Sequence, residues 1–179
     1  MCGCGRVVGS IYTQNMPKSP ASFLDGLGVP HRSVSHPPIY SVQDGIDLGL
    51  PELMGVPMEH LVKNLLLQDT HGRLVLIVAL GDARLDLKGI AHKLGCSRLS
   101  FASPQTMTEV LGSEPGSASL FDLLNNPHAQ EVTVFLDCGE VDGDIGFPED
   151  GNTRTILFPA KFLPKVVDRL TNQTDRLSA

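Results

Sequence analysis

Two apolar segments joined by a short polar turn place the strongest limit on the fold of this 179-residue chain. The segments are KNLLLQ at 63–68 and LVLIVAL at 74–80, and the turn between them reads DTHGR. Apolar runs on either side of a short glycine-containing turn predict an antiparallel β-hairpin. The second run has no polar face, so it should be buried on both sides as a central strand of a sheet.

Helix signals lie on both sides of this hairpin. Serine followed by proline, at Ser19-Pro20 and Ser103-Pro104, fits an N-cap followed by the first helical residue. Helices are expected at 19–27, from 41 onward, and at 86–94, 103–111, 119–125 and 162–170. Further strands are expected at 31–35, 98–102, 131–136 and 153–158, with a loop at 49–58. Because helices and strands do not alternate regularly, we expect an α/β or α+β fold with a mixed sheet covered by helices.

The length and composition of the chain indicate one domain with flexible ends. We expect a single domain at 19–172, a flexible segment at 1–18 and a tail at 173–179. No apolar run approaches the roughly 18 residues of a membrane-spanning helix, and the first residues do not resemble a signal peptide. The sequence therefore predicts a cytoplasmic protein without a membrane partner. A net charge of −6 argues against wrapping long duplex nucleic acid, but it permits binding of one nucleic-acid end in a small pocket.

No motif indicates a metal, a cofactor or a protein nucleophile. Cys2, Cys4, Cys96 and Cys138 do not provide two pairs at ligand spacing, and the six histidines share no ligand spacing either. No local motif indicates a Ser–His–Asp or Cys–His order. We therefore expect neither a metal nor a cofactor, and Lys63 is the residue that most needs an explanation.

Lys63 lies in an otherwise apolar strand. By alternation, Lys63, Leu65 and Leu67 share one face of this strand, and Asn64 lies on the other. A dehydrated and unpaired ammonium group would be strongly destabilising there. Two interpretations stay open. Either the side chain extends to solvent at the strand end, or it faces a pocket and attracts a phosphate or a developing oxyanion.

A loop rich in glycine, proline and serine, GSEPGSAS, runs from 112 to 119, and a helix is expected to begin at Ser119. Free N–H groups in such a loop can bind an anion or polarise a carbonyl group. An ordinary turn that caps the following helix fits the same residues equally well.

Several segments in a fixed order carry a resemblance to a known family. They are HPPIYSVQDG at 36–45, VKNLLLQD at 62–69, RLDLKGIAHKLG at 84–95, RLSFAS at 98–103, LGSEPGSAS at 111–119 and LFDLLNN at 120–126, followed by VTVFLD at 132–137. From about residue 19 to 170, the chain resembles the YbaK/ProX family of aminoacyl-tRNA deacylases. These enzymes are related to the editing domain of bacterial prolyl-tRNA synthetase.

The resemblance implies a mixed, partly barrel-like sheet surrounded by helices. It also implies hydrolysis of the ester between a wrong amino acid and the 3′-terminal ribose of a tRNA. The family's central lysine corresponds to Lys63, and its loop corresponds to Gly116, Ser117, Ala118 and Ser119. In this alignment the N–H groups of the loop would stabilise negative charge on the ester carbonyl, and the lysine would position the acceptor end.

The resemblance also implies a substrate-binding pocket and a set of partners. The pocket residues correspond to Ile39, Tyr40, Asn64, Phe147 and Asn152. The implied partners are the acceptor end of a mischarged tRNA and an aminoacyl-tRNA synthetase. Hydrolysis in this family is thought to depend on a substrate hydroxyl and a water molecule, which agrees with the lack of a triad motif.

Two positions differ from the family pattern. Leu120 stands where the loop has a proline, which concerns the stiffness of the loop, and Pro148 stands where alanyl-specific members have a histidine. The second difference concerns which amino acid is removed.

Three functions follow as hypotheses. The first is a trans-editing deacylase for a tRNA(Pro)-like substrate that carries a small amino acid such as alanine. The second is a module with the same fold that binds the tRNA acceptor end, or an aminoacyl nucleotide, without hydrolysis. The third is a small-molecule esterase, which would lack a nucleophile.

Overall fold

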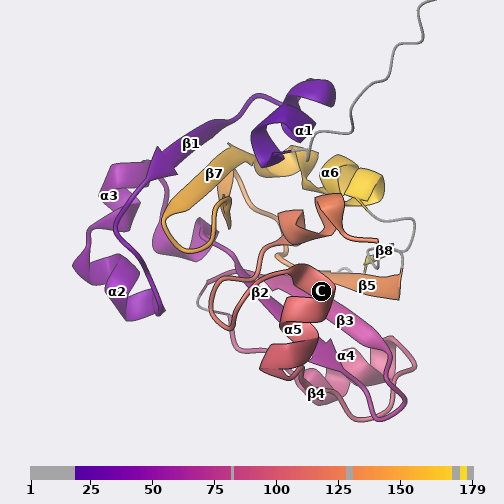
Figure 1. The fold of residues 1–179 in the computed structure, drawn as a ribbon. Coiled ribbons are helices and arrows are strands. Elements are labelled where there is room, and N and C mark those ends of the chain that lie inside the picture. The colour runs from indigo at the N-terminus through magenta and orange to yellow at the C-terminus, as the bar shows by residue number, and fades with distance from the viewer. Residues whose placement is uncertain (1–18, 82, 128–130, 171–173, 177–179) are drawn as a thin grey trace, which may run out of the picture.

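The computed structural model describes residues 19–81, 83–127, 131–170 and 174–176 (Figure 1). The segment expected to be flexible, 1–18, lies outside the described residues, as do parts of the expected tail. Within that tail, Thr174–Arg176 form strand β8, which pairs with the main sheet.

The larger sheet contains the hairpin that the sequence predicts. Its strand order is β4-β2-β3-β5-β8. The bounds are β2 Lys63–Gln68, β3 Leu74–Ala79, β4 Ser100–Phe101 and β5 Val132–Asp137. β2 and β3 pair antiparallel, whereas β3 and β5 pair parallel. The apolar strand β3 is central in this sheet, and its residues from 75 to 79 are buried. The hairpin and its central strand are therefore confirmed.

The smaller sheet has the order β1-β7-β6 and is antiparallel. Its strands are β1 Arg32–Ser35, β6 Asp144–Pro148 and β7 Arg154–Pro159. A single bridge between Leu61 and Gly146 joins it to the larger sheet, where the Val62 N–H donates to the Gly146 carbonyl at 3.0 Å. The described strands thus form two sheets that meet at one corner and do not close into a barrel, in agreement with the mixed, partly barrel-like expectation.

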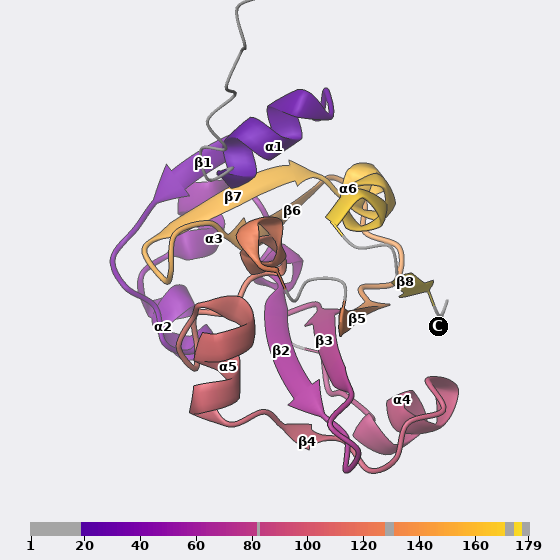
Figure 2. The ribbon, with the colours of Figure 1, turned by 45° about the vertical axis from the view of Figure 1, so that its right-hand side comes forward.

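Helices cover both sheets (Figure 2). The α-helices are α1 Pro20–Gly26, α2 Val42–Asp47, α3 Leu50–Met54, α4 Leu87–Lys93, α5 Pro104–Leu111 and α6 Leu163–Leu170. Short 3₁₀ helices are η1 Met58–His60, η2 Leu120–Asn125 and η4 Ala160–Phe162. The predicted caps are confirmed, because the hydroxyls of Ser19 and Ser103 accept hydrogen bonds from the third residue beyond each cap.

Three elements differ in detail from the prediction. Residues 49–58 do not form a loop throughout, since α3 occupies their middle between Gly49 and Gly55, both at φ +65°. Strand β6 was missed because its sequence, DIGFP, carries both glycine and proline. The segment expected as a helix at 119–125 is a 3₁₀ helix that begins with a capping box at Ser119.

The core lies on both faces of the larger sheet. On one face, α5 and α6 pack over Leu66, Leu76 and Val78, together with the aromatic side chains of the smaller sheet. On the other face, α4 packs over Leu67 and Ile77. Figure 2 shows α4 and α5 on opposite sides of the β2–β3 hairpin. This arrangement leaves the beginning of β2 close to the corner where the two sheets meet.

Candidate active site

A cavity of about 580 Å³ lies at this corner. Its wall comprises the beginning of β2, the segment 39–42, the start of α5, parts of the loop 115–118, and the facing part of the smaller sheet. β4 pairs only with Leu67 and Gln68 of β2, so the first residues of β2 have no neighbouring strand on that edge. No Asp, Glu, His or Cys lines the cavity within the described part of the chain.

Lys63 lies on the cavity wall and is half-buried. Its ammonium group donates to the main-chain carbonyl of Gly81, at 3.4 Å, and to that of Ala83. The side chain therefore lines a concave site, and its attraction of a phosphate or a developing oxyanion stays a prediction. The carbonyl groups of the segment after β3 hold the ammonium in place without neutralising its charge.

Asn64 is buried and also lines the cavity, although it lies on the opposite face of β2. Its side-chain Oδ1 accepts a hydrogen bond from the Leu120 N–H at 3.2 Å. This bond fixes the orientation of the amide, since only the oxygen can accept. Among the described residues, the Nδ2 group has no hydrogen-bond partner. A buried donor without a partner is uncommon in proteins, and this one belongs to a cavity-lining residue.

The loop that follows α5 contributes fewer free N–H groups than the sequence suggested. The Ser117 N–H donates to the Glu114 carbonyl at 3.1 Å, and the Ser119 N–H donates to the Asp122 carboxylate at 2.7 Å. The expectation that all four loop amides face the substrate is therefore wrong for Ser117 and Ser119. In the described part of the chain, the N–H groups of Gly116 and Ala118 have no partner, and both residues line the cavity.

Gly116 has a φ of +91°, a backbone conformation that glycine adopts without strain. The Ser117 hydroxyl donates to the Glu114 carbonyl at 2.9 Å and closes the turn before it. On the other side, the Ser119 hydroxyl donates to the carbonyl of Pro148 at 2.6 Å, which ties the loop to the end of β6. The loop is thus anchored at both ends, although Leu120 stands at the family's proline position.

The Asp122 carboxyl group lies beneath this loop. Burial raises its pKa from 3.8 to about 6, and the hydrogen bond from the Ser119 N–H opposes the shift only in part. The capping box thereby holds a carboxyl group that titrates slightly below neutral pH close to the anchored loop.

The segment after β1 brings two predicted residues to the cavity. The main-chain N–H of His36 donates to Thr153, and that of Ile39 donates to Asn152. The His36 ring donates from Nδ1 to the Pro37 carbonyl at 2.8 Å, so its Nε2 accepts from the Thr155 hydroxyl at 3.0 Å. These bonds position Ile39 and the following Tyr40, and both residues line the cavity.

Two predicted pocket residues lie elsewhere. Phe147 is fully buried and stacks on Phe158, with ring centroids 5.4 Å apart, because alternation along β6 directs its side chain into the core. Asn152 is in the turn before β7 and does not line the cavity, but its carbonyl accepts the hydrogen bond from Ile39. Phe147 and Asn152 therefore support the cavity wall and do not form it.

Sequence reasoning missed Gly81 and Phe101, both of which line the cavity. A Cβ atom on Gly81 would lie 2.6 Å from the Leu61 carbonyl oxygen, so only glycine fits at this point. A glycine after a buried strand was the only available signal, and it does not distinguish close packing from an ordinary turn. Phe101 is an exposed aromatic residue on the two-residue strand β4.

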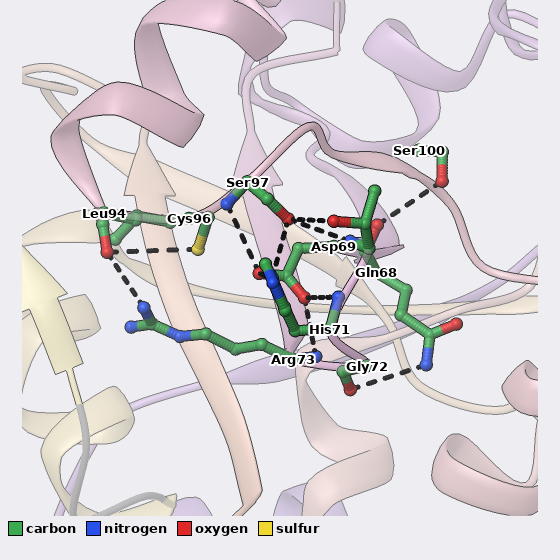
Figure 3. Close-up of polar contacts among 10 residues, drawn as sticks. Gln68, Asp69, His71, Gly72, Arg73, Leu94, Cys96, Ser97 and Ser100 are labelled. Carbon is green, nitrogen blue, oxygen red and sulfur yellow. Dashed lines mark hydrogen bonds and ion pairs between the residues drawn. The ribbon is translucent and has the colours of Figure 1, made fainter.

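A second polar cluster has the composition of a catalytic triad but not its geometry (Figure 3). His71 Nδ1 is 3.2 Å from the Ser97 hydroxyl and 3.7 Å from the Asp69 carboxylate. A triad needs the serine and the aspartate on different ring nitrogens, whereas here both approach the same one. Asp69 accepts hydrogen bonds from the N–H groups of His71 and Arg73, so the cluster fastens the hairpin turn to the segment after α4.

The residues that line the cavity thus include one ammonium group and three hydrogen-bond donors that have no partner among the described residues, from Asn64, Gly116 and Ala118. It has no lining carboxylate, imidazole or thiol in the described residues. No group of three His, Cys, Asp or Glu residues suited to a metal occurs in that part either. Donors of this kind can stabilise negative charge on oxygen atoms, as they do in the sites of one class of hydrolytic enzymes.

Comparisons with known proteins agree with this class. A family model described as the aminoacyl-tRNA editing domain matches residues 36–139. The chain is 31% identical over 146 residues to the prolyl-tRNA editing protein ProX of Acetoanaerobium sticklandii, a match that covers 80% of this chain and 85% of that protein. The chain therefore belongs to the aminoacyl-tRNA editing domain family, and it is an aminoacyl-tRNA deacylase by membership.

Solved structures support the fold. A structure assigned as a candidate trans-editing enzyme for prolyl-tRNA synthetase has a TM-score of 0.60 at 18% identity, covering 83% of this chain and 87% of that one. The crystal structure of a hypothetical protein has a TM-score of 0.64 at 17% identity, covering 87% and 96%. None of the helices in the described residues has the length and apolar character needed to span a membrane.

Proposed function

We propose that this protein is a trans-editing deacylase that hydrolyses the ester of a mischarged tRNA(Pro)-like tRNA carrying a small amino acid such as alanine. The observation that supports this most directly is the set of cavity-lining donors that have no partner among the described residues, which includes the Asn64 Nδ2 group. The identity of the tRNA is supported by the relative, which is named as a prolyl-tRNA editing protein.

The proposed reaction begins with a water molecule that attacks the ester carbonyl carbon. The carbonyl oxygen gains negative charge, which the N–H groups of Gly116 and Ala118 stabilise. The bond between this carbon and the ribose oxygen then breaks, and that oxygen takes the proton which the water releases. The products are a free amino acid and a tRNA with a free terminal hydroxyl. Lys63 and Asn64 hold the ribose and phosphate oxygens of the acceptor end.

This scheme requires a proton acceptor that the cavity wall does not supply within the described residues. A ribose hydroxyl next to the ester can relay this proton, because it gives its own proton to the leaving ribose oxygen as it takes one from the water, and it is part of the substrate. The cavity hydroxyls of Ser41 and Thr155 make hydrogen bonds with the Asp44 N–H and with His36. Substrate assistance of this kind agrees with a cavity wall that carries no carboxylate, imidazole or thiol within the described residues.

The experiment is a deacylation panel with tRNAs that carry different wrong amino acids. Wild type and Lys63→Ala are compared, and Lys93→Ala, an exposed lysine at the end of α4, is the matched control. We expect hydrolysis by wild type and the control, and a loss of at least about a hundredfold in Lys63→Ala. Full activity in Lys63→Ala, with an unchanged circular dichroism spectrum, would refute the assigned role.

The alternative functions predict other results in the same panel. A binding module would retain the acceptor end without hydrolysing any of the esters. A small-molecule esterase would hydrolyse a simple aryl ester, which has no ribose hydroxyl, as fast as the aminoacyl-tRNA. We expect no such activity on the simple ester.

We also propose an aminoacyl-tRNA synthetase as a partner that delivers the mischarged tRNA. The net charge of −6 supports this proposal, because an acidic protein makes few phosphate contacts and binds tRNA weakly on its own. Addition of the catalytically inactive synthetase should raise the deacylation rate at low tRNA concentration. No change in rate over a range of synthetase concentrations would contradict delivery.

A further inference from the structure

The two exposed aromatic side chains of the described chain lie at the same cavity. Tyr12 is outside the described residues, and every described aromatic residue except Tyr40 and Phe101 is buried or half-buried. Tyr40 is 76% exposed and Phe101 is 66% exposed, and both line the cavity. One follows β1 and the other lies on β4, so they come to the cavity from distant parts of the sequence.

Their positions are not explained by folding. A single exposed apolar side chain is ordinary in a soluble protein. Here, however, the two largest exposed apolar side chains both line a cavity whose wall also carries Lys63 and Asn64. Exposed aromatic rings in the same site as a cation are the combination that proteins use to bind single-stranded nucleic acid, where the rings stack on bases and the cation meets the backbone.

We propose that Tyr40 and Phe101 form a stacking platform for the unpaired bases at the 3′ end of the tRNA. This inference rests on the proposed function, which brings a ribose ester into the cavity that the two residues line. Bases of the single-stranded end would then lie against the rings while the terminal ribose reaches Lys63. Stacking of this kind accepts any base, so the platform would contribute affinity for the acceptor end and not selection of a particular tRNA.

Charge and polarity favour nucleotides over the other possible occupants. Two copies of this chain, each with a net charge of −6, repel one another. An apolar ligand would leave the Asn64 Nδ2 group without an oxygen partner and would bring no negative charge to the Lys63 ammonium, which contacts only neutral main-chain carbonyls among the described residues. Nucleotides supply phosphate and ribose oxygens for both groups and flat rings for the aromatic pair. A self-association surface is therefore an outcome of the test and not the proposal.

The chain contains no tryptophan, which permits a direct test. The variant Phe101→Trp carries a single fluorophore at the proposed platform, and Leu53→Trp carries one on α3, where the native side chain is 52% exposed and does not line the cavity. The probe is a hairpin RNA with a short unpaired 3′ overhang, compared with the same hairpin with a blunt end. We expect the overhang to quench Phe101→Trp and not Leu53→Trp, and the blunt hairpin to quench neither.

Kinetics give a second readout with whichever mischarged tRNA the panel identifies. Tyr40→Ala and Phe101→Ala should each raise KM by about tenfold with kcat nearly unchanged, because a stacking contact made before the reaction is lost equally in the ground and transition states. Tyr40→Phe keeps the ring and should behave as wild type. A merely structural role would not produce this rescue together with a change confined to KM.

The outcomes separate this inference from the proposed function. Active wild type with unchanged KM in both alanine variants, or equal quenching by the two RNAs, would overturn the stacking platform alone. Overhang-dependent quenching without deacylation of any tRNA would support the platform and contradict the proposed hydrolysis. A change of oligomeric state in Tyr40→Ala, with RNA binding unaltered, would mean that the aromatic pair contacts a second copy, and it would overturn the proposal.

Discussion

Replacement of Asp122 by asparagine should stabilise the protein at neutral pH and have little effect near pH 4. The carboxylate accepts a hydrogen bond from the Ser119 N–H at 2.7 Å, within the capping box that begins η2. Burial nevertheless raises the pKa of this carboxyl from 3.8 to about 6. The charged form is therefore less favourable in the folded protein than in the unfolded chain.

The sign of the pH dependence follows from that difference. The folded protein holds the proton more tightly, so the contribution of this group to the free energy of unfolding decreases as the pH rises from about 4 to about 6. A difference of about 2 pKa units corresponds to about 3 kcal/mol once the carboxyl is fully ionised. Asparagine keeps an oxygen for the Ser119 N–H and carries no charge, and the pKa of about 6 already includes the effect of this hydrogen bond. We therefore expect a net gain of about 2–3 kcal/mol at pH 7.

The assay is urea unfolding followed by circular dichroism, because the chain has no tryptophan. Wild type, Asp122→Asn and the exposed control Asp25→Asn are compared between about pH 4 and pH 7. The difference between Asp122→Asn and wild type should grow over this range. A constant difference would show that the carboxyl does not titrate there. A variant that is less stable than wild type at pH 7, but not at pH 4, would show that the ionised carboxylate is stabilising and would refute the reasoning.

Two further predictions concern residues around the cavity and the hairpin. Gly81→Ala should lower the free energy of unfolding by about 1–3 kcal/mol, because its Cβ would lie 2.6 Å from the Leu61 carbonyl oxygen. Gly26→Ala, where nothing lies within 4 Å, is the control, and equal urea midpoints for the two variants would contradict the packing argument. Asp69 is partly dehydrated, but hydrogen bonds from turn N–H groups outweigh this effect and lower its pKa. Asp69→Asn should therefore be less stable than wild type at neutral pH. The difference in the free energy of unfolding should shrink as the pH falls through the pKa of Asp69 in the folded protein. A pH-independent difference in urea midpoint would count against this explanation.

Local signals in the sequence were sufficient for much of the fold. The β2–β3 hairpin was predictable because both its pairing and its turn involve residues close together in the chain. The caps at Ser19 and Ser103 depend on contacts within one helical turn, so they could be read in the same way. The β6 strand was not predictable from such signals, because its glycine serves a close contact with Leu61 that forms only when the two sheets meet.

The candidate site was likewise predictable only where the sequence signal is local. The sequence indicated Lys63 because a charge in an apolar strand needs a local explanation. It did not indicate which loop amides are free, since this depends on hydrogen bonds from Ser119 to Asp122 and from Ser117 to Glu114. The free Nδ2 group of Asn64 was likewise invisible, because its orientation depends on the Leu120 N–H, which is 56 residues away in the chain. Hydrogen bonds of this kind could not be predicted from local sequence patterns.

In the proposed reaction, a cavity wall that offers donors but, within the described residues, no carboxylate, imidazole or thiol would select its substrates by chemistry as well as by shape. The N–H groups of Gly116 and Ala118 would stabilise an oxyanion on any ester that reaches them. Without a general base, however, that stabilisation gives a useful rate only for an ester which brings its own proton acceptor. A 3′-aminoacyl ribose has such a hydroxyl next to the ester, whereas most small esters do not. The same feature that makes the site difficult to find from catalytic motifs would thus protect other cellular esters from hydrolysis.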